Sequence, residues 1–229
     1  VSGTSISFGS STEFESGEVL SNSIPLTATF DSNEGKVVIA YSRSSSTDLG
    51  RAVVGTVSGT SISFGSLVTF QSSAITRLTS TFDSNLNKVV IFYRASSEGK
   101  AIVGTVSGTS ISFGSAVTFT TDTFDYPAAT FDSSNNKIVL SYQNGSDVTG
   151  VANVGTVSGT YISFGSDVVF RSKNVTFLGT TFDSNANKVI VTYRNSTDSL
   201  GELVVGTVSG TSISFASEVT FNTDNTRYT

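Results

Sequence analysis

The chain contains no cysteine, histidine, methionine or tryptophan. Without cysteine no disulfide can form, and without cysteine and histidine there is no zinc site of the usual Cys/His type. The Ser-His-Asp and Cys-His nucleophile systems are excluded for the same reason. Because cysteine and methionine are the side chains most readily oxidised, their absence suits a protein exposed outside the cell.

Charge is also scarce. Charged residues make up 14% of the chain, and the formal net charge is −5, which argues against binding DNA or RNA through a basic surface. No run of 18 apolar residues occurs, so no membrane span is expected. No signal peptide is visible and the first residue is not Met, so we expect a processed protein or a window of a longer one.

The sequence is repetitive. The stretch VSGTSISF begins at five positions, with Tyr161 as the one variation inside it: Val1, Val57, Val106, Val157 and Val208. A repeat of about fifty residues indicates a solenoid or a propeller.

One repeat can be divided into four strands. Residues 78–83 form a short strand that ends at an Asp turn, and residues 88–94 are β-branched and aromatic on both faces, typical of a strand between two layers. Residues 100–106 form a third strand, and residues 110–119 form a fourth with Gly114 as a bend or bulge. A four-stranded antiparallel meander of this kind is the blade of a β-propeller.

The sequence therefore predicts an all-β fold, a β-propeller in one domain, 1–229. We expect four complete blades plus an N-terminal outer strand, 4–14, as part of a five-bladed or larger propeller, with a β-solenoid as the alternative. The small residues beside each Asp place that strand innermost. Strand 4–14 has an open edge, so we expect further repeats or other copies of the chain to pair with it. The repeats lie near 1–23 (partial), 24–74, 75–125, 126–174 and 175–229.

The pattern TATFDSNEGKVVIAYSR…AVVGTVSGTSISF resembles the units of bacterial propellers of the YVTN kind. It is also similar to the regular repeat proteins of marine bacteria and their phages, which carry near-copies of VGTVSGTSISFGS. The resemblance covers essentially the whole chain. It implies the fold but not an activity, because propellers host many functions.

A meander places alternate connections on the same face. The Asp turn and the SGT turn share one face and hardly vary between repeats; we call this the constant face. The other two connections of each repeat vary in length and content and share the opposite, variable face. We expect any function to lie on the variable face, although drift of these loops would give the same pattern.

On the variable face, the residues that follow the tyrosines of the second strand are candidates for ligand binding. The arginines are suited to carboxylates or sulfates of a glycan, with the tyrosine rings stacking on sugars. Alternatively, the tyrosines fill the interface between blades and the arginines are solvated. The candidates are Tyr93, Arg94, Tyr142, Gln143, Tyr193 and Arg194.

On the constant face, the turns that begin at Asp83 and Asp183 read D-x-N-x-N, and those at Asp31 and Asp132 are close variants. Such a turn supplies alternating oxygen ligands for calcium, so calcium is the one candidate although we expect no cofactor. The same residues suit a hairpin turn, with the following Lys pairing with the Asp across the hairpin. The candidate ligands are Asp31, Asp83, Asn85, Asp132, Asp183 and Asn185.

Three functions remain open. The first is a non-enzymatic structural or adhesive repeat protein, extracellular, cell-surface or virion-associated, whose partners are glycans or cell-surface polymers. The second is a glycan-binding lectin with sites between blades. A glycosidase is the third and least expected, because the Asp is the same in every repeat and not placed in unequal roles. We therefore expect no enzyme.

Overall fold

The computed structural model describes residues 8–16, 19, 26–43 and 49–226. All regular elements in these ranges are β-strands, and every ladder is antiparallel. Within the same ranges no helix has the length and hydropathy of a membrane span. This confirms the all-β prediction, and antiparallel ladders fit a meander better than the parallel coils of a solenoid.

The strands form four similar units, each with an inner, a second and a third strand followed by two short outer strands. Unit 1 comprises β1 (Leu26–Asp31), β2 (Lys36–Ser42), β3 (Leu49–Ser58), β4 (Ser61–Phe64) and the start of β5 (Val68–Asp83). Unit 2 comprises the rest of β5, β6 (Lys88–Ala95), β7 (Glu98–Ser107), β8 (Ser110–Phe113) and β9 (Val117–Thr120). Unit 3 comprises β10 (Phe124–Asp132), β11 (Lys137–Asn144), β12 (Gly150–Ser158), β13 (Tyr161–Phe164) and β14 (Val168–Arg171). Unit 4 comprises β15 (Val175–Asp183), β16 (Lys188–Asn195), β17 (Leu200–Ser209), β18 (Ser212–Phe215) and β19 (Val219–Asn222).

The outer strand differs from the prediction. The expected single strand 110–119 is two strands, β8 and β9, which pair with opposite ends of β7. The chain bends between them at Gly114, whose N–H donates to the carbonyl of Val103 at 3.0 Å. The prediction of an N-terminal strand over 4–14 is wrong for residues 8–14, which form no ladder. Residues 4–7 lie outside the described ranges.

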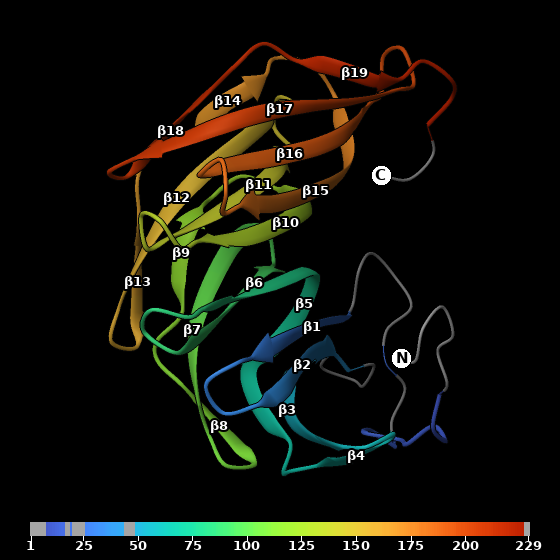
Figure 1. Ribbon diagram of the computed structural model, residues 1–229, viewed down its shortest axis with the longest axis vertical. Helices are drawn as coiled ribbons and strands as arrows, with labels where there is room; N and C mark the ends of the chain where they lie inside the picture. The colour runs from blue at the N-terminus through green and yellow to red at the C-terminus, as the bar shows by residue number, and fades with distance from the viewer. Residues whose placement is uncertain (1–7, 17–18, 20–25, 44–48, 227–229) are drawn as a thin grey trace.

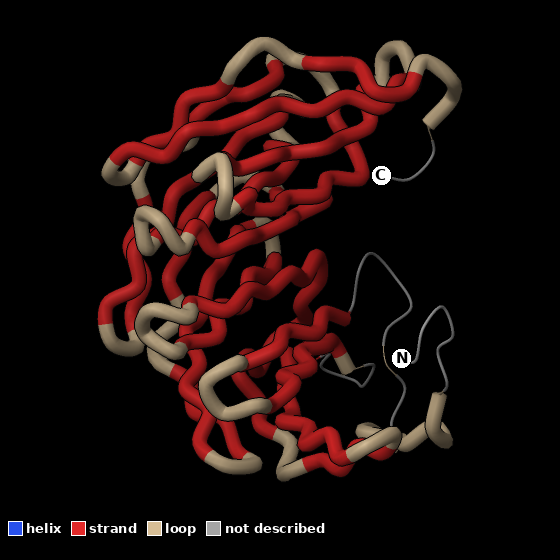
Figure 2. Tube along the Cα trace, viewed as in Figure 1, coloured by secondary structure: helices blue, strands red, loops and turns tan. Residues whose placement is uncertain are grey.

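The four units follow one another around an arc (Figure 1). The inner strands β1, β5, β10 and β15 lie on the inner side of the arc, and consecutive ones are in contact. The short outer strands lie on the outside, and strands make up most of the trace (Figure 2). These curled antiparallel sheets are compatible with a β-propeller.

The core lies between consecutive units. Ile91, in the second strand of unit 2, is fully buried in a cluster with Val38 and Ala40 of unit 1. Its neighbour Val90 is equally buried but faces Ile138 and other residues of unit 3. Since successive side chains of a strand point to opposite faces, the second strand must be apolar on both, as the sequence predicted.

Close packing between units also explains the glycine at the bend of the outer strand. A Cβ at Gly114 would overlap the carbonyl oxygen of Thr160 in unit 3, and Gly65 and Gly165 are confined in the same way. In unit 4 the equivalent residue is Ala216, which is exposed. Glycine is thus found wherever the structure places a following unit against it.

We expect Gly114→Ala to lower the free energy of unfolding by about 1–3 kcal/mol, because a backbone carbonyl cannot rotate away as a flexible side chain can. Urea unfolding measures this. The matched control is Ala216→Gly at the same repeat position, expected to change stability by less than about 1 kcal/mol. Equal unfolding midpoints for Gly114→Ala and the unmodified chain would contradict the packing argument.

Candidate functional site

The aspartate turns are stabilised by hydrogen bonds within the turn. Asp83 Oδ1 accepts the N–H groups of Asn85 and Leu86 at 2.9 and 3.0 Å, and Asn87 has the positive φ of 55° that closes the hairpin. Asp31, Asp132 and Asp183 accept the corresponding N–H groups in their own turns, including that of Asn185.

The geometry of these turns does not favour calcium binding. In each turn Oδ1 is already engaged by two N–H donors, and the described residues contain no group of three or more acidic or histidine side chains that could hold a metal. The turn interpretation therefore accounts for these residues. The predicted pairing of the lysine with the aspartate is wrong for Lys88, because its Nζ donates to Thr105 Oγ1 at 2.8 Å and not to Asp83.

The tyrosines of the second strand are fully buried between units. Tyr93, Tyr142 and Tyr193 have 0% exposure. Their hydroxyl groups donate to Gln71 at 3.1 Å, Asp167 at 2.7 Å and Glu218 at 3.3 Å, respectively. The prediction that these rings stack on a sugar is therefore wrong, because a ring packed on both faces is closed to a ligand. Burial raises the pKa of all three hydroxyls, that of Tyr93 to about 12.

The residues that follow these tyrosines have different environments. Arg94 is half-buried and donates to Thr76 Oγ1 and Asp125 Oδ1, both at 3.1 Å. Gln143 is buried, and its Nε2 donates to the carbonyl of Val175 at 2.6 Å. Arg194 donates to Ser196 and Ser199 in its own loop. Arg94 and Gln143 thus connect neighbouring units, which leaves only part of each side chain for a ligand.

A different set of side chains gathers at the start of the inner strands. Arg77, Tyr126 and Phe177 occupy one repeat position and have positive φ angles of 58°, 50° and 52°. At each of them the ladder to the second strand changes register. A left-handed backbone is unfavourable for bulky residues, and such strain is concentrated at functional sites. We call Arg77, Tyr126 and Phe177 the inner-rim row.

The three side chains of the inner-rim row contact one another across the units. The Arg77 guanidinium lies 5.7 Å from the centroid of the Tyr126 ring, and that ring lies 5.3 Å from the Phe177 ring. Arg77 also pairs with Asp125, which accepts from Arg94 as well. Two guanidinium groups on one carboxylate leave a net positive charge beside two aromatic rings, and Arg77, Arg94 and Asp125 keep 19–22% of their side chains exposed.

Sequence reasoning missed the inner-rim row because its residue types differ in every repeat. The one available signal was position, since each of these residues stands just before the run of small residues in the inner strand. The register change that turns them into a common surface depends on hydrogen bonds, which the residue types do not reveal.

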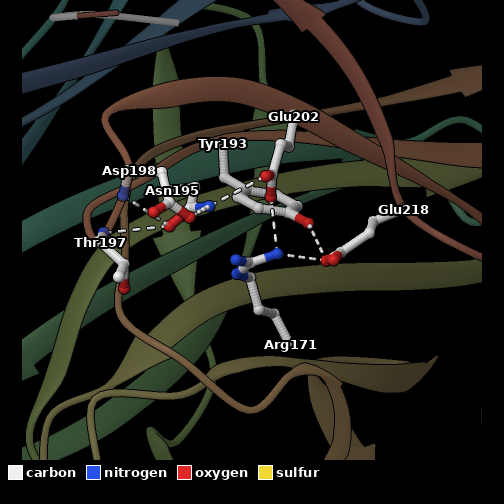
Figure 3. A network of polar contacts seen from close by, with 7 residues as sticks. All are labelled: Arg171, Tyr193, Asn195, Thr197, Asp198, Glu202 and Glu218. Carbon is white, nitrogen blue, oxygen red and sulfur yellow. Dashed lines mark hydrogen bonds and ion pairs between the residues drawn. The ribbon is translucent and has the colours of Figure 1, made fainter. Parts of the chain in front are cut away.

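A second polar cluster joins units 3 and 4 (Figure 3). Arg171 Nη1 is 2.6 Å from Glu202 Oε2 and also pairs with Glu218. Asn195 Nδ2 donates to Glu202 Oε1 at 2.9 Å, and the Arg171 guanidinium lies over the Tyr193 ring. The buried charges satisfy one another across the boundary, so we interpret this cluster as a structural connection. A pocket of about 170 Å³ beside it is lined by Phe170, Arg171, Ser172, Lys173 and Glu218.

No protein-family model matches the chain, and no curated protein matches it in sequence. The resemblance to YVTN-type propellers therefore stays a prediction.

Proposed function

We propose that the four units are consecutive blades of a five-bladed or larger β-propeller in a non-enzymatic binding or adhesive protein. The meander in each unit and the position of the inner strands inside the arc support the propeller. The ligand binds on the variable face. The scarcity of charge and the absence of oxidisable side chains support a place outside the cell, on its surface or on a virion.

The inner-rim row carries this proposal. The same strained backbone recurs in units 2, 3 and 4, while its side chain changes from Arg to Tyr to Phe. A scaffold that holds its backbone constant and varies the side chains it presents is typical of recognition by repeat proteins. On the constant face, by contrast, the constant turn position is the aspartate, whose carboxylate is engaged within its own turn, and a contact between neighbouring turns adds to this. The Glu34 carboxylate accepts the Gly108 N–H of the neighbouring unit at 3.2 Å.

Carbohydrate is the ligand class that the inner-rim row fits best. The sequence had suggested the same ligand class, but for the tyrosines of the second strand and the residues that follow them. Neighbouring rings of Tyr126 and Phe177 suit the flat apolar face of a sugar. Arg77 and Arg94 outnumber Asp125, so the site favours a carboxylate or sulfate on that sugar. Asp125 is held by both arginines, which suits it to orienting the guanidinium groups toward a ligand.

We expect binding of an acidic polysaccharide, such as a uronic acid polymer or a sulfated glycan, to weaken at least about tenfold in Tyr126→Ala and in Arg77→Ala. Affinity should also fall with added salt, because exposed charges are screened. Glycan arrays followed by titration calorimetry measure both effects.

The matched control is Tyr161→Ala, which removes a tyrosine that is 53% exposed at the constant face. This variant should bind as the unmodified chain does. Binding that is lost equally in Tyr161→Ala, or that is unaffected by Tyr126→Ala and Arg77→Ala, would place the ligand elsewhere. An array without any hit would contradict the carbohydrate proposal.

A further inference from the structure

Two positions at each boundary between units carry a different residue pair every time. The first position follows the phenylalanine of the second outer strand, and the second follows the glycine near the start of the third strand in the next unit. The ladders show that the first positions are equivalent, because Gln71, Thr120 and Arg171 each pair with the glycine of their own third strand. We call the two residues at a boundary its pairing residues. They are Glu15 with Arg51, Gln71 with Lys100, Thr120 with Val151, and Arg171 with Glu202.

A buried tyrosine of the second strand connects the pairing residues. Tyr93 is the ladder partner of Lys100, and its hydroxyl donates to Gln71 of the preceding unit at 3.1 Å. Tyr41 donates to Glu15 in the same way at 2.9 Å. Because the tyrosine, the phenylalanine and the glycine are the same at every boundary, they do not distinguish one neighbour from another. Selectivity must come from positions that vary, and the pairing residues are such positions.

The charges of the pairing residues reverse along the chain. In front of unit 1, where residues 8–16 lie in the place of a preceding outer strand, Glu15 Oε2 is 3.1 Å from Arg51 Nη1. Between units 3 and 4 the base comes from the preceding unit, and Arg171 Nη1 is 2.6 Å from Glu202 Oε2 (Figure 3). Glu15, Arg171 and Glu202 keep 4–6% of their side chains exposed. Each of these buried charges therefore depends on its partner across the boundary.

The two boundaries between these have a different chemistry. In front of unit 2, the amine of Lys100 is 2.6 Å from Glu98 of its own unit. In front of unit 3, Thr120 and Val151 carry no charge. An arginine such as Arg171 would thus meet a lysine at one of these boundaries and a valine at the other. Neither side chain can balance a buried guanidinium.

We propose that the pairing residues let each unit recognise its own neighbour, so that nearly identical units dock in one order. The partner recognised is a unit of the same fold, in this chain or in another copy of it. Docking in the wrong order would place Arg171 beside Arg51, or Glu15 beside Glu202, and like charges at a buried boundary reject the wrong partner. Nearly identical repeats need such selectivity because misassembly between repeats is a characteristic failure of their folding.

The test uses the boundary between units 3 and 4 in the full 229-residue chain. Every variant carries Glu218→Gln, which removes the second acid at Arg171 and leaves Glu202 as its partner. Arg171→Glu and Glu202→Arg, each alone, bring like charges together. The two changes combined copy the pair in front of unit 1, and Arg171→Thr with Glu202→Val copies the pair in front of unit 3. In urea unfolding, both matched sets should have an equilibrium constant for folding at least about tenfold larger than either single variant.

Mixing the two mismatched chains tests recognition directly. The chain has no cysteine, and the hydroxyl groups of Ser141 in unit 3 and Thr180 in unit 4 are in contact, so a cysteine at each place reports that the two units are neighbours. Arg171→Glu with Ser141→Cys is refolded from urea, under mild oxidation, together with Glu202→Arg with Thr180→Cys. Unit 3 of the first chain matches unit 4 of the second chain and not its own. The two chains should therefore exchange these units and become linked by a disulfide.

The comparison is a mixture of the same cysteine variants that retain Arg171 and Glu202, and one chain with both cysteines is the positive control for the disulfide. Non-reducing gel electrophoresis should show at least about tenfold more linked chains in the complementary mixture than in the comparison mixture. This result holds even where a single variant folds poorly alone, because the exchange restores a matched boundary. Equal amounts of linked chains in the two mixtures would overturn the proposal, and so would matched sets that fold no better than the mismatched variants.

Discussion

Phe119→Ala is expected to lower the free energy of unfolding by about 2–4 kcal/mol, because this partly buried ring joins two units. The Phe119 ring of unit 2 contacts Phe124, Tyr142 and Phe164 of unit 3 with centroids 5.2–5.7 Å apart. Its removal leaves a cavity that the surrounding strands cannot fill, since their registers are fixed by ladders on both sides. Urea or thermal unfolding measures the loss.

The chain supplies its own control for this prediction. Phe221 occupies the same repeat position in unit 4 but is 52% exposed. Phe221→Ala should therefore cost less than about 1 kcal/mol. Equal losses in the two variants would mean that the ring contributes to its own sheet and not to the boundary between units. A small loss for both would show that the aromatic clusters contribute little to stability.

Much of the fold could be predicted because the local pattern and the tertiary environment agree. The run around Ile91 is apolar on both faces, and only a strand packed between two layers needs that. The Asp83 turn was also predictable, since a carboxylate followed by residues tolerant of positive φ satisfies its own N–H groups. Neither inference needed knowledge of a distant residue.

The errors concern residues whose role depends on the neighbouring unit. Tyr93 follows an apolar run and could equally face a ligand or a boundary; the contact with Phe70 of unit 1 decides this. Lys88 is directly opposite Asp83 in the ladder, yet its amine reaches Thr105 on the third strand. In both cases the sequence gives the position of the residue along its strand but not the face on which its side chain finds a partner.

The inner-rim row lies furthest from what sequence can predict. Thr76 pairs with Arg94, and the next ladder pair joins Thr79 to Phe92, so Arg77 falls within the register change. A bulge of this kind redirects a side chain without leaving a residue signature. The site and the boundary are also connected, because Asp125 of unit 3 holds Arg77 and Arg94 of unit 2. A ligand at the row would therefore contact residues that connect two units.

The buried tyrosines predict a loss of stability at high pH. Burial raises the pKa of Tyr93 from 10.0 to about 12, and burial is also the main cause of the raised pKa values of Tyr41, Tyr142 and Tyr193. In the unfolded chain a tyrosine loses its proton near pH 10. Above that pH the unfolded chain binds fewer protons than the folded one, so the free energy of unfolding falls as pH rises. The stabilisation is fully present below pH 10 and is lost progressively toward the folded-state pKa.

Each such tyrosine contributes a slope of up to about 1.4 kcal/mol per pH unit in this window. Urea unfolding at a series of pH values from about 9 to 11.5 measures the total slope, and the ultraviolet absorbance of the phenolate reports whether ionisation coincides with unfolding. Tyr93→Phe removes one ionisable hydroxyl. The free energy of unfolding of this variant should therefore fall less steeply with pH, by the contribution of one tyrosine. Because the variant also loses the hydrogen bond to Gln71, it should be less stable at neutral pH. A free energy of unfolding that stays constant above pH 10, or phenolate formation in the folded chain, would show that the hydroxyls are open to water.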